Sequence, residues 1–502
     1  MRAIRKQGAE FTKAPLGEID RHVRGYSAFV YLLGMIILGG VALFTEARDL
    51  DSISSWCFLL PALLVLFALE VKSYRLHRDI FTVFSVFLLI SGSMIPITAF
   101  MQKLRPELNP VTTMAYYNGY VNYGLVTYIL SILSIAFVYN LQVARRLGYT
   151  LPLIKQKAPA PLLVLWIIAF IGITVLALYM FIQRYSDYAS FYFNLEDSRF
   201  GFGMYLFLIQ AGGCAPPLLL AYCYHYRNWK ILLIFLPVIW VCFLNPSRAY
   251  WLSVVGAALI YHHYMKKRIR PIVLGAAMFL FVPLALLIGQ LRNTIPQGRS
   301  VTISWADEQA EDLAWEMQNF NNYLLVLENY PKHSPYYYGQ MWLDIPIWFV
   351  PRQLWPEKPT VLSVLRLQDS LMGLGWEQTS FTYLSEFYAN MGIPGIILGS
   401  LLTGLVFGIA DVYNLRNRDN FNWILIYGWL VLPMMLFFSR LGFIALFANL
   451  LPAIPLATAL FFPFRKLLPA QLPVAAKVTS EFQELSRSHW PAAGMPPKDR
   501  LG

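Results

Sequence analysis

The chain carries little charge for its 502 residues. Asp, Glu, Lys and Arg make up 14% of it, whereas an average soluble domain has roughly 25%. Hydrophobic residues make up 57%, and the mean hydropathy is +0.50. Too few polar side chains remain to cover such a core in water, so the composition excludes an ordinary soluble domain. It indicates an all-α polytopic membrane protein.

Cysteine and histidine are also scarce, with 4 and 7 residues. The cysteines lie in apolar stretches without Cys-x-x-Cys spacing, so the sequence predicts neither a disulfide framework nor a metal site. His262 and His263 stand beside Lys266 at the end of an apolar stretch, where we expect them to contact water and lipid headgroups. Metalloprotease, nucleophile-elbow and phosphate-loop motifs are absent, so we predict no cofactor.

Apolar stretches of about 20 residues, the length that crosses a bilayer as a helix, recur along the chain. We predict about twelve spans, with eleven or thirteen as alternatives: 26–45, 53–72, 79–101, 119–140, 161–183, 203–224, 229–245, 247–265, 271–290, 391–413, 421–438 and 440–462. They divide the chain into a basic arm (1–25), nine helices (26–290), a polar loop (291–390), three helices (391–462) and a tail (463–502). The tail has too little apolar content to pack, which predicts disorder.

Lys and Arg alternate between the loops in the manner of cytoplasmic and outer segments. With a cytoplasmic N-terminus, 27 of the 40 Lys and Arg residues fall in cytoplasmic segments. The net charge of +12 is therefore a sign of topology, and we expect no nucleic-acid partner. Both termini are predicted in the cytoplasm, and the 291–390 loop outside.

The outer loop is the one place where a sizeable site can form outside the lipid. An amphipathic helix across the outer mouth of the bundle, ended by Pro331, is predicted by apolar residues spaced three and four apart: Leu313, Met317, Phe320, Leu324 and Leu327. Aromatic and proline residues then alternate too densely for a regular helix, so we expect residues 336–359 to form an interfacial or re-entrant segment.

Several outer arginines lie close to the membrane. Arg248 and Arg440 occupy very short turns between apolar stretches, and Arg292 follows the ninth stretch. A charge at full depth costs ~2.5–3.5 kcal/mol, so each needs a partner. A guanidinium can pair with phosphate through two parallel N–H groups. Headgroup contact or pairing with a loop carboxylate is the alternative.

Three segments resemble a known family. Asn245-Pro-Ser-Arg-Ala-Tyr250 resembles the Ser-Arg element of Wzy-type polysaccharide repeat-unit polymerases and the related O-antigen ligases. Phe349-Val-Pro-Arg-Gln-Leu-Trp-Pro-Glu-Lys-Pro359 is similar to the Pro-Arg-x-x-Trp-Pro-x-Lys-Pro segment of oligosaccharide repeat-unit polymerases. Residues 379–395 are similar to the element that follows it into the next membrane helix. The resemblance covers roughly residues 240–415.

The resemblance implies a metal-independent glycosyltransferase of O-antigen and lipopolysaccharide biosynthesis. Its substrate would be an undecaprenyl-pyrophosphate-linked glycan, joined into longer chains at the outer face of the bacterial cytoplasmic (inner) membrane. Membrane lipid and a chain-length regulator protein are the expected partners. An O-antigen ligase, which passes the glycan to a lipid A core, and a polysaccharide flippase are the alternatives. We find no convincing internal repeat and few charges within the spans before residue 290, and polar residues concentrate at one face, which favours chemistry over transport.

Each step of that reaction needs a type of side chain. Charge on the leaving pyrophosphate needs cations, and the candidates are Arg248, Arg292, Arg352, Arg440 and Lys358. The acceptor hydroxyl must lose a proton. Glu386 is the first choice as base because it matches the family's acidic position, followed by Glu377, Asp369 and His333. An ion pair explains Glu386 equally simply, and an ordinary exposed turn explains His333. Sugar rings can stack on aromatic faces, and the sugar-binding candidates are Trp348, Trp355, Tyr338 and Trp376. Anchoring at the membrane interface is the alternative explanation for these residues.

Overall fold

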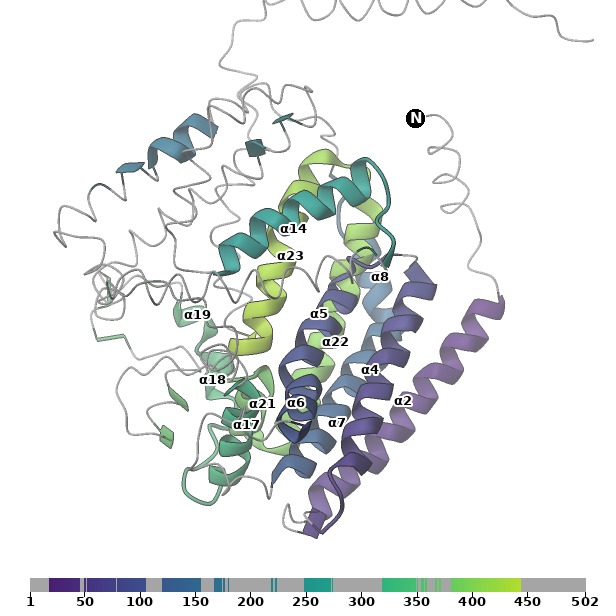
Figure 1. Ribbon diagram of the computed structural model, residues 1–502, viewed down its shortest axis with the longest axis vertical. Helices are drawn as coiled ribbons and strands as arrows, with labels where there is room; N and C mark the ends of the chain where they lie inside the picture. Colours follow the sequence, from purple (N-terminus) through teal and green to yellow (C-terminus); the bar gives the residue numbers. More distant parts are fainter. Residues whose placement is uncertain are drawn as a thin grey trace, which may run out of the picture. The chain divides into compact units, whose positions relative to one another are not determined.

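The computed structural model describes residues 18–45, 52–77, 79–104, 120–154, 248–271, 318–348 and 381–443, with shorter pieces between these ranges. They belong to one unit of the chain, Met1–Leu460. Every regular element in this described part is a helix, as Figure 1 shows. The predicted all-α class is confirmed for these residues.

Six helical segments among the described residues are long and apolar enough to cross a membrane, which confirms a multi-pass membrane protein. They closely match six predicted spans. Val83–Leu104 is a continuous path whose central π-helical turn accommodates Pro96, which has no N–H to donate. The elements are α2 (Glu18–Phe44), α4 (Trp56–His77), α5 (Val83–Gly92), η1 (Ser93–Ile97), α6 (Thr98–Leu104), α7 (Val121–Asn140), α22 (Ile393–Asn417) and α23 (Phe421–Leu441).

The eighth predicted span is also a helix, α14 (Arg248–Met265). The predicted spans 161–183, 203–224, 229–245, 271–290 and 440–462 lie largely outside the described residues, as does the 463–502 tail. Helix α2 begins at Glu18, and its part that is long and apolar enough to cross a membrane is Ser27–Phe44, close to the predicted span 26–45. The count of twelve spans stays a prediction.

Small residues let α22 pack closely against its neighbours. A Cβ added at Gly404 would lie 3.0 Å from the Ile135 Cα of α7. A Cβ at Gly399 would lie 2.6 Å from the ring of Phe387 in α21 (Tyr383–Met391). Such close approach gives dispersion contacts, which hold membrane helices together where lipid removes most of the hydrophobic driving force.

The helices α14 and α23 pack along each other in opposite directions. A Cβ at Gly256 of α14 would lie 3.1 Å from Leu432 Cγ, while Tyr261 near the end of α14 meets Phe421 at the start of α23, with ring centroids 5.6 Å apart. The start of α14 and the end of α23 therefore lie toward the same end of the pair.

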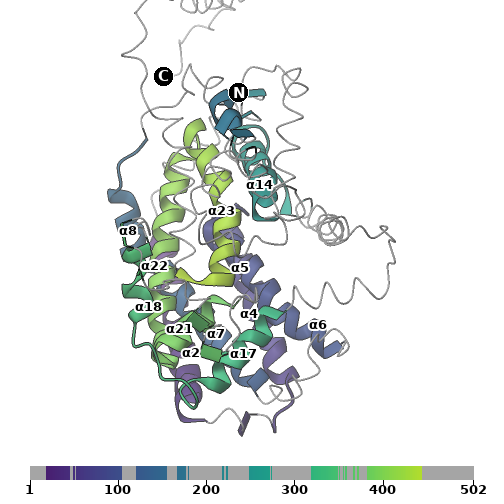
Figure 2. The same ribbon diagram turned by 90° about the vertical axis from the view of Figure 1, so that its left-hand side faces the viewer.

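Polar segments gather at two opposite ends of the described helices. The basic end consists of the last turn of α4 and the segments that follow α7, α14 and α22, and its exposed cations are Arg75, Arg146, Lys266, Lys267, Arg268 and Arg270. At the loop end, four short helices precede α22: α17 (Gln318–Asn329), α18 (Gln340–Leu343), α19 (Ile345–Trp348) and α21. Figure 1 and Figure 2 both show α17, α18 and α21 together at the lower end. Which end faces the cytoplasm stays a prediction from charge.

Candidate functional site

The loop end is attached to the membrane helices by buried hydroxyl groups. Thr127 of α7 bonds to the Tyr323 hydroxyl of α17 at 2.6 Å. Ser131 of α7 contacts the Tyr383 hydroxyl of α21 at 3.2 Å and the Ser400 hydroxyl of α22 at 2.7 Å. These bonds fix α17 and α21 relative to α7 and α22, and so fix the position of Glu386 within α21.

Local sequence explains where α21 stops. Gly392 follows α21 at φ 65, a backbone conformation that glycine adopts without strain, and Pro394 occupies the first turn of α22, where its missing N–H costs little. The chain turns sharply here, with the Tyr336 ring filling the space beside Gly392. Glu386 therefore lies just before a membrane span, as predicted, and the structure places it on a short helix.

The Glu386 side chain is buried, with 2% of its surface exposed. Its Oε1 accepts hydrogen bonds from Trp342 Nε1 at 2.9 Å and from the Phe443 N–H at 3.4 Å. Residue 442 is glycine at φ 77, and a Cβ there would lie 2.6 Å from Glu386 Cδ. The carboxylate thus lies directly against the backbone that follows α23, and its orientation is fixed from two sides.

An aromatic cluster surrounds one side of this carboxylate. The Trp342 ring meets Phe387 and Phe443 edge to face, with centroids 5.8 and 6.1 Å apart. Phe387 and Phe443 also contact each other at 5.1 Å, and both contact Phe438. Trp342 is therefore held by its ring while its N–H points to Glu386, an arrangement that keeps one donor on one carboxylate oxygen.

Two of the predicted arginines belong to the same end as Glu386. Arg440 is in the last turn of α23, two residues before Gly442, which places its backbone within roughly 7 Å of the residue against the carboxylate. Arg248 is the first residue of α14, and the antiparallel packing of α14 on α23 brings it toward the same end. The structure thus places Glu386 beside the end of α23 that carries Arg440, with the start of α14 directed toward that end.

The other described candidates lie in more exposed positions. His333 is exposed in the turn after α17. Lys358 donates from Nζ to the Val350 carbonyl at 2.9 Å, closing the turn around the predicted family segment. Tyr338 is 75% exposed and Trp355 is 41% exposed, so both rings are accessible to a ligand or to lipid. The side chains of the remaining candidates lie outside the described part of the structure: Glu377, Asp369, Arg248, Arg292, Arg352, Trp348 and Trp376.

The amphipathic helix predicted before Pro331 is confirmed in its second half. Phe320, Leu324 and Leu327 of α17 are 1 to 3% exposed, and Pro331 follows the helix end. The first part of the predicted helix, with Leu313 and Met317, lies outside the described residues. The following segment contains only α18 and α19, each four residues long, so the expected lack of a regular helix there is confirmed where it is described.

Tyrosines pack between α17 and α21. Tyr336 stacks on Tyr330 and meets Tyr388 edge to face, with centroids 6.3 and 6.0 Å apart. The Tyr388 hydroxyl donates to the Tyr330 carbonyl at 3.5 Å. Burial raises the pKa of Tyr330, Tyr336 and Tyr388, because a phenolate would lose its water there. These hydroxyls stay protonated and support the loop end as neutral groups.

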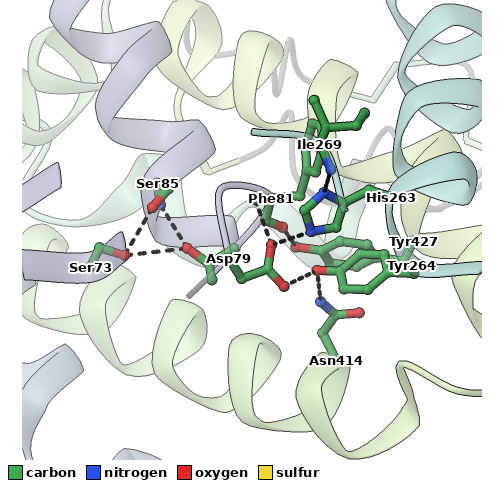
Figure 3. A network of polar contacts seen from close by, with 10 residues as sticks. Ser73, Asp79, Phe81, Ser85, His263, Tyr264, Ile269, Asn414 and Tyr427 are labelled. Carbon is green, nitrogen blue, oxygen red and sulfur yellow. Dashed lines mark hydrogen bonds and ion pairs between the residues drawn. The ribbon is translucent and has the colours of Figure 1, made fainter. Parts of the chain in front are cut away.

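A second polar network lies at the basic end (Figure 3). Asp79 accepts hydrogen bonds from the Phe81 N–H at 2.8 Å and the Tyr264 hydroxyl at 2.6 Å. Its Oδ1 also lies 3.5 Å from His263 Nε2. His263 Nδ1 accepts the Ile269 N–H at 3.0 Å, so the ring proton sits on Nε2 and faces Asp79.

Asp411 of α22 continues this network toward α5. It accepts hydrogen bonds from the N–H groups of Val83 and Phe84 at 2.6 and 3.3 Å and from the Tyr139 hydroxyl at 2.9 Å. A carboxylate at a helix N-terminus is stabilised by the helix dipole. The network therefore joins the turn between α4 and α5 to α7, α14 and α22.

Two expectations from the sequence are wrong here. His263 is 4% exposed and faces Asp79 instead of water and headgroups, because the helix turns it inward although Lys266 is only three residues away. Polar groups are also not confined to one face, since Asp79 and Asp411 are buried at the basic end. Both carboxylates bond to protein groups that link helices, which is a structural use of charge.

No three His, Cys, Asp or Glu side chains come together as a metal site would require, within the part of the chain that is described. The comparisons with family models, with curated proteins and with solved structures found no match for this chain. Its function is therefore inferred from the site itself.

Two residues of the site were not predicted. Trp342 was one of many aromatic residues near the membrane, and nothing in the local pattern singles out its N–H as the donor to Glu386. Gly442 carried a weak signal, because glycine after an apolar helical stretch commonly ends the helix. Its contact with Glu386 could not be read from that signal.

Proposed function

We propose that the chain is a membrane glycosyltransferase that polymerises undecaprenyl-pyrophosphate-linked oligosaccharide repeat units at the outer face of the cytoplasmic membrane. The observation that carries the proposal is the buried Glu386 carboxylate, oriented by Trp342 and by the backbone at Gly442 and Phe443. It lies in the segment that resembles the polymerase family, and Arg440 is two residues from its backbone contact.

In the proposed reaction, the oxygen of an acceptor sugar hydroxyl forms a bond to the anomeric carbon of the donor. The bond from that carbon to the pyrophosphate oxygen breaks, and the lipid pyrophosphate leaves with the electron pair. The hydroxyl proton passes to Glu386 as general base. A base held in one orientation and away from bulk water acts without first reorganising its surroundings.

The leaving pyrophosphate needs positive charge in the same region. Arg440, in the last turn of α23, is the described candidate, and Arg248 begins α14, whose start lies toward the same end of the helix pair. A guanidinium can hold two phosphate oxygens at once, which fits a diphosphate better than a single ammonium does. The membrane spans beside the site would accommodate the polyprenyl chain of the donor. Arg352 and Arg292 complete the proposed set from the sequence.

The exposed aromatic rings would hold the sugars. Tyr338 and Trp355 are exposed, and an exposed aromatic ring can stack on a pyranose ring. Trp348 and Trp376 are the further sugar-binding candidates by sequence. A chain-length regulator protein remains the proposed partner that would determine how many repeat units are added.

The test is synthesis from purified components. Full-length protein in detergent receives a lipid-pyrophosphate repeat unit without nucleotide sugar, divalent metal or lipid A core. The expected result is a ladder of longer lipid-linked glycans on a gel. A requirement for lipid A core would identify a ligase, and transport of the lipid without new glycosidic bonds would identify a flippase. Either outcome, or no ladder with a chain-length regulator present, would overturn the proposal.

A further inference from the structure

The helix α8 (Gln142–Thr150) has an unusual distribution of apolar side chains. Its buried face consists of small residues, Ala144 at 0% exposed and Gly148 packed against α22. Its large apolar side chains point outward: Val143, Leu147 and Tyr149 are 58%, 42% and 57% exposed. A helix that packs only on protein has the reverse pattern. The exposed face of α8, turned away from α22, therefore fits an apolar environment outside the protein.

The position of α8 along α22 places this face at the membrane boundary. The 25 residues of α22 span about 37 Å, which exceeds the roughly 30 Å of a hydrocarbon core. The end of α22 therefore extends into the headgroup layer. Ala144 packs beside Gly408, and the Ile154 N–H donates to Asn417 Oδ1 at 3.1 Å, so α8 follows these last turns.

Arg416 holds the end of α8 in place. Its Nη1 donates to the carbonyl groups of Gly148, Tyr149 and Leu151 at 2.8, 2.8 and 2.9 Å, which satisfies acceptors that the helix end leaves open. The guanidinium also lies over the Tyr149 ring, 5.4 Å from its centroid. These contacts hold α8 in place, and its exposed apolar face continues into Leu151 and Leu153, which are 38% and 52% exposed.

A cation borders this apolar face. Arg146 is exposed on α8 and lies between Val143 and Leu147 in the sequence. Exposed apolar residues next to an arginine, at headgroup depth, match the two parts of an anionic phospholipid: acyl chains and a phosphate group.

We propose that α8 together with Leu151 and Leu153 is a membrane-interface anchor that binds anionic phospholipid. Val143, Leu147 and Tyr149 enter the boundary between headgroups and acyl chains, and Arg146 pairs with the headgroup phosphate. Lipid is the occupant because α8 joins α7 directly and packs along α22, both of which cross the membrane. The site is separate from the proposed glycosyltransferase reaction and does not depend on it.

The test measures which lipids touch α8. The four native cysteines are replaced by alanine, and Thr150→Cys, an exposed position at the end of α8, carries an environment-sensitive fluorophore. The full-length protein is reconstituted in phosphatidylcholine vesicles that contain phosphatidylglycerol. Quenching is compared between nitroxide-labelled phosphatidylglycerol and nitroxide-labelled phosphatidylcholine. One nearby arginine predicts a preference of about fivefold for the anionic lipid.

Three variants separate charge at this site from charge elsewhere. Arg146→Gln should bring the quenching ratio close to one, whereas Arg146→Lys should keep most of the preference. Arg75→Gln, an exposed arginine of the basic end that lies on α4, should leave the ratio at the wild-type value. Equal quenching by both lipids in the wild type would overturn the proposal. Quenching by aqueous iodide and by neither lipid would also overturn it, because α8 would then face water. Dipolar coupling between spin labels at residue 150 would overturn it as well, because it would show that a second copy of the chain covers α8.

Discussion

Replacing Trp342 with phenylalanine removes the indole N–H that donates to Glu386 Oε1 at 2.9 Å and keeps an aromatic ring in its place. The ring would still meet Phe387 and Phe443, whose centroids lie 5.8 and 6.1 Å from that of Trp342. The variant therefore isolates one hydrogen bond to a buried carboxylate. It tests whether the orientation of Glu386 matters for the proposed reaction.

The size of the effect follows from the role of the bond. The bond holds the carboxylate in one orientation, and misplacing a catalytic group by about 1 Å can cost roughly 100-fold in rate, so kcat should fall by roughly ten- to 100-fold. We expect KM to change little, because Trp342 acts through Glu386 and not on the donor lipid. The acidic limb of the kcat profile should also move to higher pH, since a carboxylate that has lost a donor is protonated more readily.

The assay is the rate of glycan extension from a purified lipid-pyrophosphate repeat unit, with the thermal midpoint of each variant measured beside it. Trp56→Phe is the matched control, because Trp56 also meets a phenylalanine edge to face, with centroids 5.9 Å apart, but lies on α4. Wild-type kcat and an unmoved pH profile in Trp342→Phe would refute the proposed role of the bond. An equal loss in Trp56→Phe would show a general effect of the substitution.

Three further variants test the groups around Glu386. Gly442→Ala should abolish extension, because φ is 77 at this position and a Cβ would lie 2.6 Å from Glu386 Cδ. The control Gly40→Ala, with open space around its Cβ, should stay active, and an active Gly442→Ala would contradict the contact. Arg440→Lys keeps the charge but loses the two-pronged donor, so kcat should fall steeply at an unchanged thermal midpoint, and full activity would leave Arg440 as an interface anchor. Burial raises the pKa of Tyr388, so its contribution to the free energy of unfolding is complete below about pH 10 and declines above it by ~1.4 kcal/mol per pH unit. In Tyr388→Phe the free energy of unfolding, measured from pH 10 to 12, should decline less steeply with pH by that amount. An unchanged slope would contradict the burial argument.

Much of the helical framework could be predicted because each membrane span has to be apolar along its own length. The six described spans, α14 and the buried face of α17 at Phe320, Leu324 and Leu327 all follow from that local rule. The turn between α21 and α22 also has a local cause, Gly392 followed by Pro394. These features need no knowledge of which helices are neighbours.

The site itself depends on contacts that no local pattern contains. Trp342 and Glu386 are 44 residues apart, and Phe443 is 57 residues beyond Glu386. The apolar stretch from residue 391 correctly predicted a membrane helix just after Glu386, but it could not supply the partners of the carboxylate. His263 was misjudged for the same reason, since its partner Asp79 lies in a turn far away in the sequence.

The most direct test of the central claim is extension by Glu386→Gln. The amide has nearly the same shape, and its oxygen can still accept the Trp342 N–H, but it cannot take up the acceptor proton effectively. The account predicts that this variant binds the lipid-pyrophosphate donor as the wild type does and produces no ladder. A ladder of wild-type length and rate from Glu386→Gln would contradict the role of Glu386 as the base.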